Sequence, residues 1–403
     1  MARVVKRIAH ALSEALRQLD TARLRRSRLT VEGFAEPGNR ARVRLKGRTL
    51  VDFSCNDYLG LARHPALAAA MRECAGSEGA GSAASHLVSG HGIEHARLEE
   101  ELAAFTQRER ALLFSTGYMA NLAVLCAFAG RGERVLLDRL SHASLIDGAR
   151  LSGATLRRYA HADAQAAARL VDEDREHTAV IATDGVFSMD GDLAPVAALA
   201  RTARAADAWL AVDDAHGLGV VGADGRGTLA LEGVSGEEVP LLIGTLGKAF
   251  GCFGAFVAGS DETIELLMQK ARPYIYTTAL PQPVAAASRA ALKVAQSEPW
   301  RRERLAALIE RFRKGAAEMR LAICASRTPI QPVVLGSEAA VLAAQHELEA
   351  QGLLVVAIRP PTVPKGSARL RIALSAAHTE ADVDRLVEAL GSAVQRAAGA
   401  GAA

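Results

Sequence analysis

The sequence predicts an α/β fold in which a mostly parallel sheet is covered by helices on both faces. Short, continuous apolar runs alternate with helical patterns through the middle of the chain, as is typical of strands buried on both faces. Glycine turns or helices bound each of these runs. The chain has 403 residues, of which 50% are hydrophobic and 23% charged, so it can bury a large core without disulfides or a structural metal.

The predicted strands of this sheet are short and follow one another along the chain. They are residues 111–114, 135–137, 179–183, 209–213, 241–245 and 253–258. Helices are expected between them, one beginning at Gly117 and one over residues 141–151. In open parallel sheets, ligands collect at the carboxyl ends of the strands, so the residues that follow each strand are candidates for a functional site.

Two further units flank the sheet. The first 20 residues form an amphipathic pattern that predicts a helix packed on the body of the protein, with the apolar stripe Val5, Ile8, Leu12, Leu16 and Leu19. Residues 42–52 predict a hairpin that turns at Lys46–Gly47. We therefore expect an N-terminal segment over residues 1–50 and a large domain over residues 51–282.

The remainder of the chain predicts a smaller α+β domain over residues 283–403. A long helical pattern runs from about Gln282 to Arg320, and a closing helix is expected over residues 380–394. Between them we expect strands near residues 330–335, 353–358 and 370–374.

The composition excludes several classes of protein. Lysines and arginines exceed aspartates and glutamates by only three charges, which excludes a strongly basic nucleic-acid-binding protein. The five cysteines include no CxxC pair, so they indicate reduced thiols in the cytoplasm and not a disulfide framework or a zinc site. No apolar run is long enough to span a membrane, and no secretory signal is present at the N-terminus. We expect no nucleic-acid or membrane partner.

Two motif matches are weak in their context. Residues 217–222 match GxGxxG, but no clear helix follows the glycines, as a dinucleotide-binding fingerprint requires. His91-Gly-Ile-Glu94-His95 matches an inverted zinc-peptidase signature. Because Gly90 and Gly92 flank His91, a polar loop entering a helix explains this segment better, and we expect no metal. A zinc peptidase stays the alternative from a different class of function.

The most informative segment is residues 244–251, in which Lys248 lies among four glycines just past a predicted strand. Glycines allow the backbone to approach a bound group closely. A lysine amine attacks a carbonyl best when burial lowers its pKa. Lys248 is therefore a candidate for a Schiff-base lysine, with an ordinary turn lysine as the alternative.

A second segment follows the predicted strand 209–213 and places Asp213 and His216 three residues apart. A carboxylate at a strand end can pair with a protonated pyridine nitrogen and so keep that ring cationic. The imidazole of His216 can then contact the ring's phenolic oxygen or the phosphate side. The same residues also fit a metal pair or a solvated loop.

Three other strand ends add polar groups that fit the same ligand. Residues 114–121 place hydroxyls and Gly117 at a helix start, which suits a phosphate, or an ordinary N-cap. His142 can stack on an aromatic ring, and Ser188 can donate to a ring oxygen, although a structural histidine and a tight turn explain these two as well. Taken together, the five strand ends describe a pyridoxal phosphate site better than any other site.

Motifs over most of the chain resemble the α-oxoamine synthases, a family of fold-type I pyridoxal phosphate enzymes. The similar segments occur in family order and are SCNDYLG (54–60), SHASLIDGAR (141–150), GVFSMDGD (185–192), DDAHGLGVVG (213–222) and GTLGKAFG (244–251). The resemblance covers roughly residues 45–390. It implies an aminotransferase-like large domain with a mostly parallel seven-stranded sheet, a smaller C-terminal domain and a homodimer with shared active sites.

The resemblance also implies a role for each matched residue. Lys248 would carry pyridoxal 5'-phosphate as a Schiff base, Asp213 would pair with the pyridinium nitrogen, His216 would contact the phenolic oxygen, and His142 would stack on the ring. Ser188 and Thr245 would line the cofactor. The backbone at Gly117 and Tyr118 would hold the phosphate, and Thr277 or Thr278 would reach the phosphate in the partner subunit. Asp184 departs from the glutamate that the family pattern leads us to expect.

Segments near the C-terminus resemble the branch of the family that joins L-alanine to a pimeloyl thioester in biotin biosynthesis. They are RPPTVP (359–364), Arg369-Leu-Arg371 and the earlier HLVSGH (86–91). This resemblance implies that Arg371, near Asn56, binds the amino-acid carboxylate. It also implies that Thr362 and an arginine of the Arg25–Arg26 pair, taken as Arg25, contact the acyl substrate. The donor is expected on coenzyme A or on an acyl carrier protein, and the alternative is a sister enzyme that uses glycine or serine.

Arginines are dense in two N-terminal clusters, which are Arg23, Arg25, Arg26 and Arg28, and Arg40, Arg42, Arg44 and Arg48. A solvated surface is the simpler interpretation. A basic rim that attracts the phosphates of coenzyme A or an acidic carrier protein is the functional one.

Overall fold

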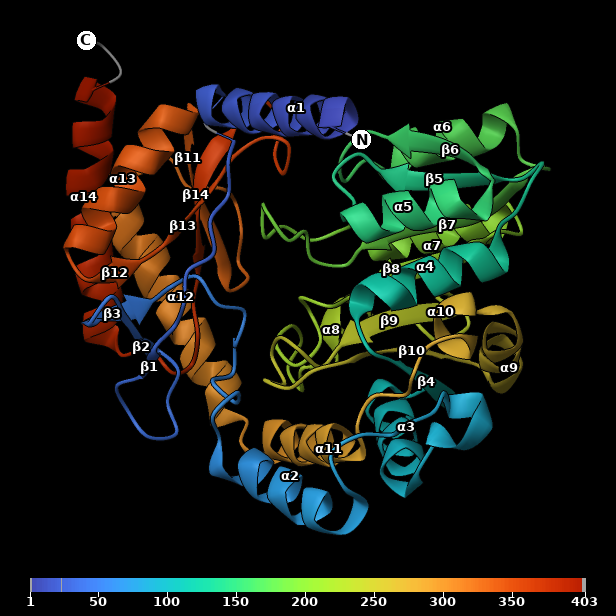
Figure 1. Cartoon of the computed structure of the whole chain (residues 1–403). Coiled ribbons are helices and arrows are strands. Elements are labelled where there is room, and N and C mark those ends of the chain that lie inside the picture. The colour runs from blue at the N-terminus through green and yellow to red at the C-terminus, as the bar shows by residue number, and fades with distance from the viewer. Residues whose placement is uncertain (1, 23, 401–403) are drawn as a thin grey trace.

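The expected α/β architecture is present in a computed structural model, which describes residues 2–22 and 24–400 (Figure 1). A seven-stranded sheet forms the centre of the large domain. Its strands are β4 (Arg110–Phe114), β5 (Arg134–Asp138), β6 (Thr155–Tyr159), β7 (Thr178–Asp184), β8 (Trp209–Asp213), β9 (Leu241–Thr245) and β10 (Ala255–Gly259). The strand order is β4-β10-β9-β8-β7-β5-β6, and only β10 runs antiparallel to its neighbours.

The sheet is buried on both faces, as its continuous apolar strands predict. In β5, Val135 and Leu137 contact one hydrophobic cluster while Leu136 contacts the other. The first cluster is closed by α4 (Gly117–Phe128), α5 (Ala143–Ser152), α9 (Asp261–Lys270) and α10 (Arg272–Ile275). The second is closed by α6 (Ala164–Glu173), α7 (Val196–Ala205) and α8 (Gly227–Glu232).

All six predicted strands of this sheet form, but one edge strand was missed. Strand β6 carries exposed Arg157 and Arg158, so its sequence lacks the apolar run of a strand buried on both faces. The predicted strand 253–258 begins only at Ala255, because Cys252 and Gly254 belong to the loop that turns back beside Leu246.

The C-terminal part of the chain forms two small sheets. One contains β11 (Ile330–Gly336), β14 (Ala368–Ala373) and β13 (Val356–Ile358), which are all antiparallel. The other contains β1 (Gly33–Phe34), β2 (Arg42–Leu45), β3 (Arg48–Asp52) and β12 (Leu353–Leu354), so the predicted strand 353–358 is divided between two sheets. Because β3 pairs with β12, the N-terminal hairpin extends the C-terminal domain (Figure 1).

The remaining helices surround these sheets. They are α1 (Ala2–Thr21), α2 (Pro65–Glu78), the π-helix η1 (His86–Gly90), α3 (Ile93–Thr106), α11 (Gln282–Ser297), α12 (Trp300–Glu318), α13 (Glu338–Ala350) and α14 (Glu380–Ala400). The long helical pattern after Gln282 is interrupted at Glu298–Pro299, where Pro299 caps the start of α12. None of the helices in the described part of the chain is both long and apolar enough to span a membrane.

Helix α1 forms as predicted. Its apolar stripe was expected to pack on the body of the protein, and this is wrong for the stripe residues whose exposure is described. Leu12, Leu16 and Leu19 are 61%, 45% and 41% exposed. The chain continues from α1 through mostly exposed residues 24–32, which have no helix or strand. No regular element among those described residues therefore ties the helix to the core.

The loop of residues 185–193 joins the two domains. It follows β7, and Gly191 in this loop lies against the C-terminal domain, where its carbonyl oxygen accepts hydrogen bonds of 2.9 Å from both Ser326 and Thr328. Gly191 has a φ of +72°, and a Cβ atom at this position would lie 2.4 Å from the carbonyl oxygen of Ile330. The contact between the domains therefore requires glycine here.

We expect Gly191→Ala to lower the free energy of unfolding by about 3 kcal/mol, since it adds overpacking to the strain of a positive φ. Gly233→Ala is the matched control, because Gly233 has a φ of +67° but nothing within 4 Å of an added Cβ. That control should cost only about 1–2 kcal/mol. Urea unfolding followed by circular dichroism measures both, and equal losses would show that the domain contact tolerates a side chain.

Candidate active site

A cavity of about 810 Å³ opens at the carboxyl ends of the parallel strands, between the large domain and the C-terminal domain. Most of the polar side chains that the sequence singled out line it. From the large domain they are His142, Ser188, His216 and Lys248, and from the other segments they are Arg26, Asn56, Thr362 and Arg371. Residues that are distant in the sequence but were singled out there therefore share one cavity.

A chain of hydrogen bonds runs across the cavity floor from Arg371 to Lys248. Arg371 Nη1 donates to Asn56 Oδ1 at 3.1 Å, and the Tyr58 hydroxyl donates to the same oxygen at 3.1 Å. The Tyr58 oxygen lies 2.7 Å from Nδ1 of His216, whose Nε2 lies 2.7 Å from Nζ of Lys248. Since the Tyr58 proton points to Asn56, we assign the His216 proton to Nδ1, which leaves Nε2 to accept from Lys248.

The environment of Lys248 makes its amine easier to deprotonate. Burial lowers the pKa of Lys248 to about 8, against the attraction of Asp213 and Asp184. Burial and the charges of Lys248 and Arg371 hold the pKa of His216 well below its usual range, so its ring is neutral. The amine can therefore gain and lose a proton near neutral pH, as the single lysine of the glycine-rich segment 244–251 suggested.

Three carboxyl groups lie beneath the lysine at the ends of β7 and β8. Asp184 and Asp213 are neighbours in register, and burial together with Asp213 raises the pKa of Asp184 well above its usual range. Burial also raises the pKa of Asp214 to about 7, although the Thr228 amide donates to it at 2.7 Å. Burial and mutual repulsion therefore shift Asp184 and Asp214 toward their protonated, neutral forms.

Both carboxylate oxygens of Asp213 accept hydrogen bonds. Its Oδ2 accepts a hydrogen bond of 2.6 Å from Asn121 on α4, and its Oδ1 accepts one of 3.1 Å from the Ala215 amide. Each carboxylate oxygen keeps a second lone pair for another donor. Sequence reasoning missed Asn121, although it lies one helical turn after Gly117 in a motif that was singled out.

His142 caps α5 and lines the cavity. Its Nδ1 lies 2.7 Å from the Ser144 hydroxyl, and its backbone amide donates to Asp184 at 2.9 Å. Asp184, the residue found in place of the expected glutamate, therefore accepts a hydrogen bond from the backbone of His142, whose ring was predicted to stack on the cofactor.

The N-terminus of α4 offers room for a phosphate. Thr116 caps the helix by accepting from the Met119 amide, and a Cβ atom at Gly117 would have nothing within 4 Å. The Tyr118 hydroxyl donates to Asp147, and the predicted contact of its backbone with a phosphate stays a prediction. Thr245 Oγ1 donates to the Gly254 carbonyl at 3.0 Å and does not line the cavity itself.

At the other end of the cavity, Arg26 and not Arg25 is the arginine beside Thr362. Arg26 Nη2 donates to Thr362 Oγ1 at 3.1 Å, whereas Arg25 pairs with Asp20 at 2.8 Å on the surface. The choice of Arg25 was therefore wrong by one residue, because both arginines follow the same helix and no sequence signal separates them. Arg139 and Arg158 also line the cavity, and the sequence gave no signal for either.

Thr277 and Thr278 lie outside the cavity of their own chain. Thr277 Oγ1 donates to the Pro273 carbonyl at 2.6 Å, and Thr278 pairs with Ser85 in an isolated bridge. Their predicted contact with a partner subunit stays a prediction.

The loop of residues 185–193 is fixed from both sides. Arg371 Nε donates to the Ser188 carbonyl at 2.7 Å, so this loop orients the arginine that faces the cavity. On its other side, His161 places Nδ1 3.0 Å from Asp138 and Nε2 2.7 Å from Asp192. Burial opposes a charge on this ring, but the two carboxylates outweigh it and raise the pKa of His161 to about 10.

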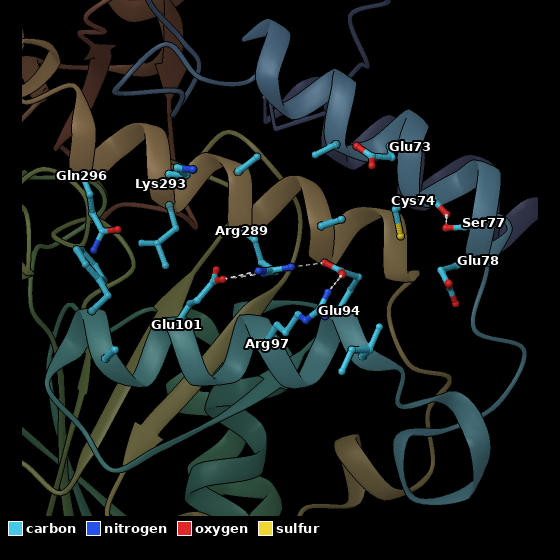
Figure 2. Close-up of a pocket in the computed structure, with 17 residues that line it drawn as sticks. Glu73, Cys74, Ser77, Glu78, Glu94, Arg97, Glu101, Arg289, Lys293 and Gln296 are labelled. Carbon is cyan, nitrogen blue, oxygen red and sulfur yellow. Dashed lines mark hydrogen bonds and ion pairs between the residues drawn. The ribbon is translucent and has the colours of Figure 1, made fainter.

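A second cavity, of about 830 Å³, lies between α2, α3 and α11 (Figure 2). Glu94 in its wall pairs with Arg289 at 2.7 Å and with Arg97 at 3.0 Å, and Arg289 also binds Glu101. The glutamate of the HGIEH segment is therefore neutralised by arginines and cannot serve as the base of a peptidase.

Known proteins are similar to this chain over most of its length. A family model for class I and II aminotransferases matches residues 48–390. An 8-amino-7-oxononanoate synthase from Methylococcus capsulatus is 55% identical over 390 residues, which are 97% of this chain and 99% of the relative.

Two solved structures share the fold over most of the chain. Serine palmitoyltransferase from S. paucimobilis, with a bound PLP–myriocin aldimine, has a TM-score of 0.90 at 27% identity and covers 98% of this chain and 99% of its own. An 8-amino-7-oxononanoate synthase from Francisella tularensis has a TM-score of 0.75 at 31% identity and covers 86% of this chain and 98% of its own.

We expect the His161 contacts to stabilise the protein in a pH-dependent way. Because folding raises the pKa of His161 from 6.5 to about 10, its contribution is complete below pH 6.5 and is lost as the pH rises to 10. His161→Gln should therefore cost about 1–2 kcal/mol at pH 6, after allowance for solvent screening, and much less at pH 10. Unfolding of both proteins across this range measures the difference, and a cost that does not change with pH would contradict the charged ring.

Proposed function

The chain belongs to the 8-amino-7-oxononanoate synthases of the class I and II aminotransferase family, and we propose that it condenses L-alanine with a pimeloyl thioester. The products are 8-amino-7-oxononanoate, CO2 and the free thiol. It is a pyridoxal phosphate enzyme that takes an amino acid and an acyl thioester. The observation that carries the proposal is one cavity that is lined by Lys248, by Arg371 and by the hydrogen-bonded pair Arg26–Thr362.

The residues beneath the cavity fit the cofactor. Pyridoxal phosphate, when bound, withdraws the electron pair that is left on the α-carbon of the amino acid after its proton is removed. Asp213 would hold the ring nitrogen protonated, and the N-terminus of α4 at Gly117 would hold the phosphate. His142 would lie against the ring, while Ser188 and Thr245 would flank it.

The amine of Lys248 would serve as the base once it is free of the cofactor. Its pKa of about 8 lets it take a proton and return it at the operating pH of a cytoplasmic enzyme. The neutral His216 beside it accepts a hydrogen bond from Nζ, which orients the amine toward the cavity. Removal of the α-proton requires a group that can accept a proton and that is held at a fixed position.

Arg371 would bind the carboxylate of L-alanine. Its guanidinium is held at Nε by the Ser188 carbonyl, while Nη1 shares the Asn56 oxygen with Tyr58. A planar guanidinium that is fixed on one edge can present the other edge to a carboxylate. Such a grip fixes the rotation of the amino acid and therefore which bond is broken at its α-carbon.

The far end of the cavity would bind the acyl donor. The guanidinium of Arg26, beside Thr362, offers a positive charge to the distal carboxylate of a pimeloyl chain. The exposed guanidinium groups of Arg139 and Arg158 suit the phosphates of coenzyme A or of a carrier protein's prosthetic group. The enzyme would act as a homodimer, in which Thr277 or Thr278 completes the phosphate site of the partner.

Lys248→Ala should abolish turnover, by at least about 10⁴-fold, because both the attachment point and the base are removed. The wild-type protein should be yellow, and borohydride should fix the cofactor to Lys248 in a peptide that mass spectrometry identifies. Lys293→Ala, in the wall of the second cavity, is the matched control and should keep colour and turnover. Near-normal turnover of a folded Lys248→Ala protein would overturn the proposal.

The two arginines should separate the two substrates in steady-state kinetics. We expect Arg371→Lys to raise KM for L-alanine by about 10- to 100-fold and to leave KM for the thioester nearly unchanged, because lysine lacks the planar fork. Arg26→Lys should show the opposite pattern. A panel of alanine, glycine and serine with the wild type tests the alternative substrates, and a clear preference for glycine or serine would contradict the assignment of alanine.

A further inference from the structure

We infer that His86, His91 and His95 form a binding site for a divalent transition-metal ion, with Zn²⁺ as the best fit. One ring nitrogen of each histidine lies within 4.8 Å of the others. Three imidazoles with an open fourth position form a common type of zinc site. From the sequence, only His91 and His95 were candidate ligands, and no metal was expected. His86 was not a candidate because its distance from these two residues depends on the fold.

The ring nitrogens need only small shifts to hold an ion. Nδ1 of His86 lies 2.9 Å from Nδ1 of His91, where the two rings share one hydrogen bond. Nitrogen ligands of tetrahedral zinc lie about 3.3 Å apart, given Zn–N bonds of about 2.0–2.1 Å. An ion between these rings would replace the shared proton and open the pair by a few tenths of an ångström.

The outer nitrogen of His95 already has the contact that metal-bound histidines make. His95 Nε2 donates to the Leu280 carbonyl at 2.6 Å, which fixes its proton there and leaves a lone pair on Nδ1. That lone pair now accepts from the Gly92 amide at 2.9 Å, a contact that an ion would displace. His91 Nε2 lies 3.9 Å from Glu99, which can accept its outer proton.

The local fold explains why the three histidines meet. His86 begins the π-helix η1, His91 follows its end, and His95 is in the first turn of α3, so the one-turn bulge brings His86 back over the helix start. The ring of His86 stacks on Tyr274, with centroids 4.8 Å apart and planes at 9°. The amide of Ala279 donates to the Ala84 carbonyl just before η1.

An ion here would therefore fix η1, α3 and the Tyr274–Ala279 segment to one another. This segment contains Thr277 and Thr278, so the ion would hold in place the backbone that carries these two threonines. A peptidase role is excluded because Glu94 faces the arginines of the second cavity (Figure 2). None of the three histidines lines the active-site cavity, so the metal site is separate from that cavity.

The test uses the full-length holoenzyme without an affinity tag, after treatment with EDTA and removal of unbound cofactor. Titration with Zn²⁺, followed by calorimetry, should show one ion per chain with a micromolar or tighter Kd. Zn²⁺ should also raise the Tm, because it binds only the folded site. Co²⁺ in place of Zn²⁺ should give the strong visible absorption of a tetrahedral site.

The double variant His86→Gln, His91→Gln should weaken Zn²⁺ binding by at least about 100-fold and lose the rise in Tm. His346→Gln, an exposed histidine on α13, is the matched control and should bind like the wild type. If the double variant does not fold, the single variant His86→Gln takes its place and should weaken Zn²⁺ binding by an intermediate amount. Binding of less than half a zinc ion per chain would overturn the inference. Unchanged Zn²⁺ binding in the variants that lack His86 would also overturn it, because free cysteines would then be the ligands.

Discussion

The active site depends on balancing buried negative charge at the ends of β7 and β8. Asp184 and Asp213 lie side by side in register, and Asp214 follows directly, while Lys248 is the amine that faces them. Backbone amides and Asn121 stabilise these carboxyl groups but bring no positive charge. The proposed pairing of a cationic ring nitrogen with Asp213 would add positive charge here, and the cofactor would then contribute to the electrostatics of the fold as well as to the chemistry.

The substrate end of the site depends on the joint between the domains. The loop of residues 185–193 gives its Ser188 carbonyl to Arg371 and its Gly191 carbonyl to Ser326 and Thr328, while His161 holds the same loop to the large domain. Because Arg371 belongs to the C-terminal domain and Lys248 to the large domain, this loop helps to set the distance between the Arg371 guanidinium and the Lys248 amine. A change in the loop of residues 185–193 would therefore move these two groups relative to each other.

Much of the fold and of the site could be predicted from the sequence, since short apolar strands locate the residues that follow them. Lys248, Asp213, His216 and His142 come directly after such strands and meet at one edge of the sheet. Edge strand β6 was missed because its arginines hide the apolar pattern, and residues 353–358 were assigned to one strand where two sheets divide them.

The contacts that sequence reasoning missed depend on elements that are distant in the chain. Tyr58 was quoted within a motif, yet its place between Asn56 and His216 follows only from how residues 54–60 lie against β8. Arg26 and Arg25 cannot be separated in the sequence, because which one reaches Thr362 depends on the extended path after α1. His86 meets His91 only because η1 is a π-helix.

The hydrogen-bonded chain from Arg371 to Lys248 has a fixed direction. Arginine can only donate, so Asn56 must present its oxygen to it, and Tyr58 must donate to that same oxygen. His216 is then protonated on Nδ1 and accepts from Lys248 on Nε2. A carboxylate at the free edge of Arg371, as proposed, would polarise the guanidinium that donates to Asn56 at the start of this chain. Binding of the amino acid and the proton on Lys248 would then be coupled through side chains of the protein itself.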